Sequence, residues 1–259
     1  MITDCENYRI AIISIFPKMF NSITSFGMCR RAIEKKKLEI LVINPRDYSE
    51  KKNGRIDDKS YGGEPGMIIK YVPLERSILK ANEFFKKKTR VVYLSPQGKI
   101  LNQDKLKLLL EDEGLVLICG RYQGIDQRII EDYVDEEISI GNYVLSGGEL
   151  AAMVLIDGLI RNIAGVLNNS ESLNQESLSI GMLNCPHYTR PRVLLNGKSI
   201  PKVVASGNHE KIKKWRRRQQ VISTAVKRYD LIKNANLSKE EKIMIKLIKN
   251  KRFRKSNEK

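Results

Sequence analysis

Histidine and paired cysteine are scarce in this chain of 259 residues. It holds two histidines, His187 and His209, so a histidine-rich metal site is not expected, and a Ser-His-Asp triad would have to use one of the two. The four cysteines are scattered, and no two of them form a C-x-x-C pair. This spacing is typical of reduced thiols in a cytosolic protein and argues against a disulfide framework.

Long apolar runs are also absent. The best one, Leu150–Ile160, is interrupted by Asp157 and Gly158 and is shorter than the ~20 residues of a membrane span. The opening residues have neither the basic region nor the apolar stretch of a secretory signal peptide. Because 41% of the residues are hydrophobic, the chain has enough apolar material for a core. We therefore expect a folded cytoplasmic protein without a membrane partner.

Acidic residues are also scarce relative to basic ones, and this imbalance is concentrated in the last quarter of the chain. The sequence has 47 Lys and Arg against 30 Asp and Glu, a formal net charge of +17. From Lys202 onward, 19 basic and 5 acidic residues give +14, whereas the first 201 residues carry +3. Such a basic segment attracts polyanions by counterion release, which predicts a nucleic-acid partner. A merely solubilising tail is the alternative, but a general compositional bias would spread along the whole chain.

The first two thirds of the chain alternate between strand-like and helix-like segments. Short apolar runs predict strands at Ile10–Phe16, Leu38–Ile43, Arg90–Leu94, Leu115–Cys119 and Glu137–Ser139. Helices are expected at Ser22–Lys37, Asp104–Leu110, Ile125–Tyr133 and Gly148–Ile160. Because continuous apolar strands between helices are typical of a sheet covered on both faces, we expect an α/β fold with a mostly parallel sheet.

The pattern changes after residue 167. Residues 168–179 are polar and without apolar period, which predicts a flexible linker between an N-terminal domain, residues 1–167, and a smaller C-terminal domain, residues 180–259. The C-terminal domain is basic and is expected to be helical over His209–Val226 and Ser238–Ile248. Ser238 and Glu241 have the spacing of a capping box at the start of the second helix.

Three glycine-bearing loops follow predicted strands, at residues 94–98, 120–126 and 140–149. In open α/β sheets, ligands bind beyond the carboxyl ends of the strands, and glycine lets the backbone approach a flat ligand. Taken singly, each loop could be an ordinary strand-to-helix turn. None has the spacing of a dinucleotide fingerprint or a P-loop. Together they predict a ligand site of another kind.

Seven blocks of residues carry a resemblance to a known family. They are Ser14-Ile-Phe-Pro, Tyr61-Gly-Gly-x-Pro-Gly-Met, Tyr93-Leu-Ser-Pro-Gln-Gly, Cys119-Gly-Arg-Tyr-x-Gly-Ile-Asp, Ser139-Ile-Gly-x-Tyr-Val-Leu-Ser-Gly-Gly-Glu, Cys185-Pro-His-Tyr-Thr-Arg-Pro and Ser206-Gly-Asn-His. In this order the blocks are similar to the bacterial tRNA (guanine-N1)-methyltransferases, the TrmD family of knotted, SPOUT-type methyltransferases. They span most of the chain.

The resemblance implies a homodimer that moves the methyl group of S-adenosylmethionine to N1 of guanosine 37, just 3′ of the anticodon, in tRNA. It also implies a deep trefoil knot in the N-terminal domain, a C-terminal domain that binds tRNA, and active sites across the dimer interface. Carried over by position, the residues that bind the methyl donor are Tyr93, Leu94, Ser95, Pro96, Gly120, Tyr122, Ile140, Gly141, Asn142, Tyr143, Val144 and Leu145. Family members use Mg²⁺, but no ligand cluster in this sequence identifies a metal site.

The chemistry predicts which further residue types are needed. N1 of neutral guanine carries a proton, so a base must remove it and a cation must stabilise the charge that spreads toward O6. The resemblance puts the base at Glu176, where the family has Asp, and the supporting arginine at Arg161. Glu171 is the other candidate for the base. A solvated linker carboxylate without a catalytic role is the alternative interpretation of Glu176.

Several other positions depart from the family pattern. Glu64 replaces a glycine, while neutral side chains replace acids at Gln123, Gln127, Asn142 and Asn184. Two alternative functions therefore stay open: a tRNA-binding protein with impaired catalysis, and a knotted methyltransferase that acts on another RNA position. Arg121 and Asp126, in one block, could form a simple ion pair, although their place in that block favours a structural role at the dimer.

Overall fold

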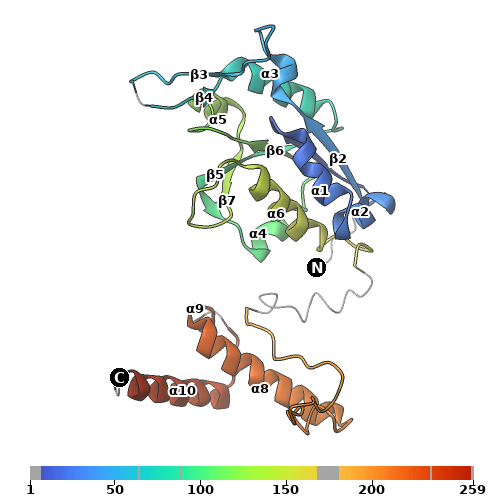
Figure 1. Cartoon of the computed structure of the whole chain (residues 1–259), viewed down its shortest axis with the longest axis vertical. Helices are drawn as coiled ribbons and strands as arrows, with labels where there is room; N and C mark the ends of the chain where they lie inside the picture. Colours follow the sequence, from blue (N-terminus) through green and yellow to red (C-terminus); the bar gives the residue numbers. More distant parts are fainter. Residues whose placement is uncertain (1–6, 64, 88, 168–180, 234, 258–259) are drawn as a thin grey trace. The chain divides into compact units, whose positions relative to one another are not determined.

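The structure is a computed structural model that describes residues 7–63, 65–87, 89–167, 181–233 and 235–257 (Figure 1). Two compact units, Met1–Ser170 and Glu171–Lys259, make up the chain. The predicted linker, with Glu176 and Glu171, lies outside the described residues, and so does Glu64.

The first unit is built on a five-stranded sheet. Its strands are β1 (Tyr8–Ile13), β2 (Leu38–Ile43), β5 (Arg90–Ile100), β6 (Gly114–Cys119) and β7 (Glu136–Ser139), in the order β2-β1-β6-β5-β7. All four neighbouring pairs are parallel. The predicted α/β class with a mostly parallel sheet is therefore confirmed.

Helices cover both faces of this sheet. One face packs against α2 (Gly27–Glu34), α4 (Gln103–Leu109) and α6 (Glu149–Ile160), and the other against α3 (Tyr71–Asn82) and α5 (Gln127–Tyr133). The alternation is clear in β1, where Ile10 and Ile12 enter the first core and Ala11 and Ile13 enter the second. Because successive strand residues point to opposite faces, a strand covered on both sides must be apolar throughout.

Smaller elements complete the first unit. They are the 3-10 turns η1 (Pro17–Phe20) and η2 (Pro45–Tyr48), the short helix α1 (Asn21–Thr24), and an antiparallel pair of two-residue strands, β3 (Asp57–Asp58) and β4 (Ile68–Ile69). The single helix predicted over Ser22–Lys37 is wrong. It is broken between α1 and α2, where Phe26 is extended and Gly27 has φ +66°, a conformation that glycine adopts at little cost.

Strand β5 is longer than predicted and changes register along its length. Its pairing with β7 shifts between Leu94 and Lys99. The segment between them carries Ser95 and Pro96 out of the regular ladder, as a bulge does. Gly98 follows, where a Cβ atom would lie 2.4 Å from the backbone of Glu137. The bulge is what turns Ser95 and Pro96 toward the loops after β6 and β7.

The second unit is helical and has a small core of its own. It contains α8 (His209–Lys227), α9 (Tyr229–Ile232) and α10 (Lys239–Asn257). The buried residues Met182, Val221, Ala225 and Ile245 form this core. None of the described helices in either unit combines the length and the apolar character that a membrane crossing requires.

The predicted capping box at the start of α10 is confirmed. The backbone N–H of Ser238 donates to Glu241 Oε2 at 2.8 Å, and the N–H of Glu241 donates to Ser238 Oγ at 3.2 Å. Glu241 also pairs with Arg217 of α8 at 2.6 Å, and this hydrogen bond, followed by that from Ser238, lowers the pKa of the Glu241 carboxyl. One carboxylate therefore both starts α10 and joins it to α8.

Candidate functional site

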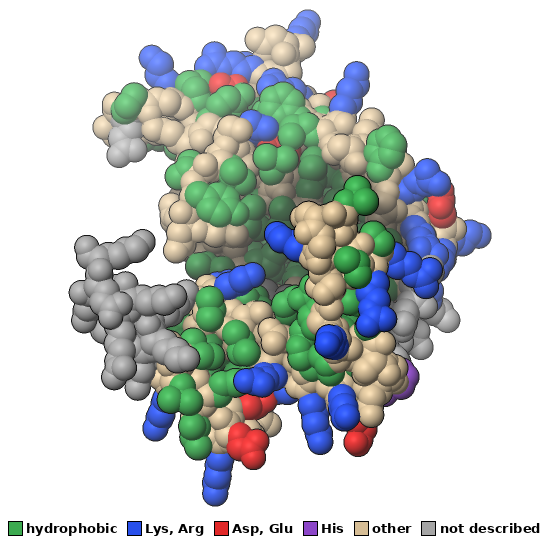
Figure 2. Space-filling view, turned by 60° about the horizontal axis from the view of Figure 1, so that its bottom comes forward, with side chains coloured by type: hydrophobic (Ala, Val, Ile, Leu, Met, Phe, Trp, Pro, Cys, Tyr) green, Lys and Arg blue, Asp and Glu red, His purple; other side chains and the backbone are tan. Residues whose placement is uncertain are grey.

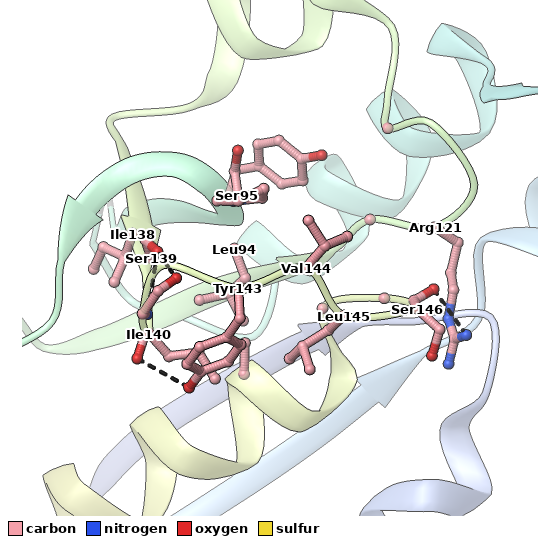
Figure 3. Close-up of a pocket in the computed structure, with 18 of the residues that line it drawn as sticks. Leu94, Ser95, Arg121, Ile138, Ser139, Ile140, Tyr143, Val144, Leu145 and Ser146 are labelled. Carbon is pink, nitrogen blue, oxygen red and sulfur yellow. Dashed lines mark hydrogen bonds between the residues drawn. The ribbon is translucent and has the colours of Figure 1, made fainter.

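A pocket of about 310 Å³ opens at the carboxyl ends of β6 and β7, beside the bulged part of β5, where three chain segments meet (Figure 3). The first segment is Tyr93 to Pro96 within β5, the second is the loop after Cys119, and the third is the loop from Ile140 to Gly148. This is the edge of a parallel sheet at which ligands of open α/β folds bind. The volume lies within the range of roughly 300–1,000 Å³ that is usual for small-molecule sites.

Eleven of the twelve residues that the resemblance assigns to the methyl donor line this pocket. The exception is Asn142, which is exposed. The structure therefore brings together three segments that 23 and 17 residues separate along the chain. Their role in binding a donor stays a prediction.

The pocket walls suit a flat ligand with a few polar groups. Tyr93 is buried, and burial, followed by the charge of Glu137, raises the pKa of its hydroxyl to about 12, so the ring stays neutral. At Gly120, a Cβ atom would lie 2.7 Å from Tyr93 Oη. Glycine at this position therefore lets the ring of Tyr93 lie directly against the loop backbone, which any side chain would prevent. The described residues fit a nucleoside-sized ligand in this respect.

The third loop is hydrogen-bonded at both of its ends. At the start, Ser139 Oγ donates to the carbonyl of Gly141 at 3.0 Å and accepts from its N–H at 3.2 Å. At the end, the N–H of Gly148 donates to the carbonyl of Gly120 at 2.9 Å. Between these anchors the side chains of Tyr143 and Val144 are exposed, and Figure 3 shows that Tyr143 folds back to the carbonyl of Ile140.

Arg121 is the charged residue of the pocket wall, and its partner differs from the one considered from sequence. Arg121 Nε donates to Glu149 Oε2 at 2.9 Å. Asp126 instead pairs with Arg128 at 2.7 Å and caps α5 by accepting the Arg128 N–H, contacts that lower the pKa of Asp126. The simple Arg121–Asp126 ion pair is therefore wrong.

Tyr122 and Gln123 connect the pocket to the loop that contains Tyr61 and Met67. Tyr122 has φ +61°, a strained conformation for a residue other than glycine. The next residue donates its backbone N–H to the carbonyl of Met67 at 3.0 Å and its side-chain amide to the carbonyl of Pro65. A carboxylate could not make the second bond. From the sequence, Gln123 is recognisable only as a position where the family has an acid, and its role as a donor depends on a contact with Pro65, 58 residues away.

Arg161 belongs to the first unit but does not line its pocket. It caps the carboxyl end of α6, whereas the pocket contacts the first turn of that helix at Gly148 and Ala151. Ten residues of α helix separate Ala151 from Arg161, which corresponds to about 15 Å along the axis. The structure thus keeps the predicted arginine apart from the predicted donor site of the same chain.

No group of three or more His, Cys, Asp or Glu side chains in the described parts of the chain is arranged to hold a metal ion.

The second unit presents a strongly basic helix. On α8 the side chains of Lys211, Lys213, Lys214, Arg216 and Arg218 are all exposed. Figure 2 shows Lys and Arg side chains spread over the visible face, while Asp and Glu side chains are few. A surface of this kind binds phosphates without reading sequence.

These features define a two-part protein: a parallel α/β unit with a nucleoside-sized pocket, joined to a basic helical unit. The family model described as tRNA (Guanine-1)-methyltransferase TrmD matches residues 8–234, so the chain belongs to this family.

Curated relatives agree with this assignment. A protein of Francisella philomiragia is 50% identical over 237 residues, 92% of this chain and 93% of the relative. One of Aliivibrio salmonicida is 48% identical over 236 residues, 91% of this chain and 94% of the relative. Both relatives carry the name tRNA (guanine-N(1)-)-methyltransferase.

Proposed function

We propose that this chain transfers the methyl group of S-adenosylmethionine to N1 of guanosine 37 in tRNA. The observation that carries the proposal is the single pocket that gathers eleven of the twelve donor-binding positions of the family. The basic helical unit supports tRNA as the partner. Since tRNA is a cytoplasmic molecule, the proposed place of action is the cytoplasm.

The pocket is the proposed site of the methyl donor. The donor brings a sulfonium group, whose neutral leaving group makes methyl transfer chemically easy. What remains for the protein is to hold the donor and the guanine in line, because well-oriented reactants gain several kcal/mol over free ones. Gly120 and Gly141 let the rings of Tyr93 and Tyr143 lie against the loop backbone, and the side chains of Tyr93 and Leu94 supply apolar walls.

Glu176 is the proposed base, with Arg161 as the supporting cation. Glu and Asp have reference pKa values that differ by only about half a unit, so Glu is chemically able to accept the N1 proton. Its carboxylate extends about one methylene further than that of Asp. Misplacement on the order of 1 Å can cost ~10²-fold in rate, so we propose that the polar linker repositions the carboxylate.

The proposal includes a homodimer whose two active sites each take residues from both chains. The distance of about 15 Å between the pocket end of α6 and Arg161 supports it, because a second copy can supply the arginine that the same chain keeps away. Apolar side chains exposed beside α6 support it too: Leu150 is 49% exposed, Val154 52% and Phe26 69%. Phe26 and Val154 border a second, largely apolar depression of about 450 Å³.

The proposed division of labour follows the two compact units. Residues 1–167 hold the donor, residues 168–179 carry the base, and residues 180–259 dock tRNA. A trefoil knot at the pocket, which the family resemblance implies, also belongs to the proposal. The meeting of the bulged part of β5 with the loops after β6 and β7 at one pocket supports it.

The test is methylation of tRNA transcripts that carry either G or A at position 37. Product on the G form alone is the expected result. Product on other RNA would favour a knotted methyltransferase with a different target. Tight, salt-sensitive binding without product would favour a tRNA-binding protein with impaired catalysis. The observation that favours this second candidate is the neutral Gln123 at the pocket, where the family has an acid.

A further inference from the structure

A buried carboxylate stands directly behind the pocket. Glu149 begins α6, and its side chain is 1% exposed. It accepts from Ser14 Oγ through Oε1 at 2.9 Å and from Arg121 Nε through Oε2 at 2.9 Å. An ionised group at this depth has to be fully hydrogen-bonded, and both of its oxygens are.

The carboxylate is the centre of a continuous hydrogen-bonded chain. The backbone N–H of Phe16 donates to Ser14 Oγ at 3.0 Å, and Ser14 donates to Glu149. Arg121, held by Glu149, donates through Nη1 to the carbonyl of Ser146 at 3.0 Å (Figure 3). Its guanidinium also lies 4.6 Å from the centre of the Phe16 ring. The chain therefore joins the segment after β1 to the third pocket loop.

The packing around this chain admits little adjustment. A Cβ atom on Gly147 would lie 2.2 Å from Arg121 Nε and 2.6 Å from Glu149 Oε2. A Cβ on Gly148 would lie 2.8 Å from the backbone of Cys119. The two glycines thus let the loop backbone pass against the ion pair. The guanidinium of Arg121 is a rigid, planar group. The carboxylate of Glu149, which binds Nε, therefore also sets the position of Nη1, the atom that donates to the carbonyl of Ser146.

We infer that Glu149 is a positioning residue for the methyl donor: through Arg121 it holds the Ser146–Gly148 end of the pocket loop in its binding shape. This inference rests on the proposed function, which makes the pocket the donor site. It accounts for two sequence blocks that the reaction itself does not use, Ser14-Ile-Phe-Pro and the final Glu of Ser146-Gly-Gly-Glu. Stability alone gives little reason for such a pair, since apolar residues of similar size often replace buried ion pairs without loss.

The test is the affinity of the full chain carrying Glu149→Gln for S-adenosylmethionine and for S-adenosylhomocysteine. Glutamine keeps the size, but its amide has one acceptor oxygen, so it cannot accept from both Ser14 and Arg121. We expect both ligands to bind about tenfold more weakly, the effect of losing one hydrogen bond to a charged group. The KM for the donor should rise while kcat at saturation stays within about twofold.

The matched control is Glu136→Gln in the same unit. Glu136 is also ion-paired, with Arg90 and Lys105, but it does not line the pocket. Calorimetric titration is done at a temperature at which circular dichroism shows every variant folded. The control should keep the affinity of the unmodified chain. Ser14→Ala removes the hydrogen bond from Ser14 to Glu149 and leaves the Glu149–Arg121 ion pair in place. If Glu149→Gln does not fold, Ser14→Ala tests the inference instead, and we expect it to bind the donor about threefold more weakly.

Three results would overturn the inference. Unchanged donor affinity in Glu149→Gln, or in Ser14→Ala where the first variant does not fold, would make the pair purely structural. Weakening for S-adenosylmethionine but not for S-adenosylhomocysteine, which lacks the sulfonium charge, would point to charge compensation of Arg121 instead of loop position. Failure of the unmodified chain to bind either ligand would overturn the proposed function, and this inference with it.

Discussion

At the scale of single residues, the proposed role of Glu176 as the base can be tested by removing its carboxylate. We expect Glu176→Gln to lower the single-turnover rate of tRNA methylation by 10²-fold or more, within the range attributed to general base catalysis. The amide cannot accept the N1 proton, whereas binding of donor and tRNA should persist. Rapid-quench measurement with saturating donor separates the chemical step from product release.

The matched control for this prediction is Glu171→Gln, five residues earlier in the same polar segment. Its rate should stay near that of the unmodified chain. A normal rate for Glu176→Gln together with a large loss for Glu171→Gln would move the role of base to Glu171. Normal rates for both variants would contradict a linker carboxylate as base.

Residue spacing could not predict the partner of Arg121. Asp126 lies five residues away and Glu149 twenty-eight, so local distance favours the wrong acid. Asp126 instead starts α5, because an Asp side chain at a helix N-terminus accepts the free backbone N–H groups there. Arg121 follows β6, and its true partner Glu149 begins α6. The two residues meet only because the chain forms β7 in the sheet and then returns to the end of β6.

At the scale of elements, the basic face of α8 should govern how tRNA binding depends on salt. We expect the double variant Lys213→Gln, Lys214→Gln to lower the magnitude of the slope of log K against log salt by about 1.4 to 1.8, because each phosphate contact contributes roughly 0.7 to 0.9. Donor affinity should not change. Filter binding of tRNA over a series of KCl concentrations measures the slope.

Lys86 and Lys87 provide the matched control pair. Both are exposed and adjacent in sequence, but they belong to the first unit. Their double change to Gln should leave the slope as it is. An equal fall in both double variants would mean that total charge, and not α8, attracts the RNA.

The elements themselves could be predicted where one physical signal dominates. β6 is an uninterrupted apolar run after Gly114, and β2 is apolar except for Glu39; Gly120 and Pro45 follow these runs, and the capping box of α10 is a purely local pattern. The helix α3 was not expected, since Pro73 in its first turn and its mixed polarity hide the period. The break between α1 and α2 was also missed, because one apolar face continues across it and only Gly27 marks the change.

At the scale of the whole molecule, the separation of Arg161 from the pocket predicts that inactive chains can complement each other. Gly120→Val places a side chain against Tyr93 and should block the pocket, while Arg161→Ala removes the cation. Co-expressed and purified as a mixture, the two variants should recover about a quarter of the unmodified activity. Half of the dimers are then mixed, and one of the two sites in each mixed dimer is intact.

The control replaces the second chain by one that carries both changes. Mixed with Gly120→Val, it cannot form an intact site and should recover nothing. Recovery only in the first mixture establishes sharing of sites between chains. Its absence, in mixtures where differently tagged chains purify together, would mean that each chain supplies its own Arg161.

The strand order has a consequence for how the chain is made. β1 pairs with β2 nearby in sequence, but its other neighbour is β6, with Arg9 opposite Gly114. At roughly 5–20 residues per second, a ribosome needs about 5–20 s to make the intervening hundred residues. During that time the apolar edge of β1 that later pairs with β6 has no strand beside it. The carboxylate of Glu149 is made later still, so the loops around the pocket can take their final arrangement only after the sheet beneath them is complete.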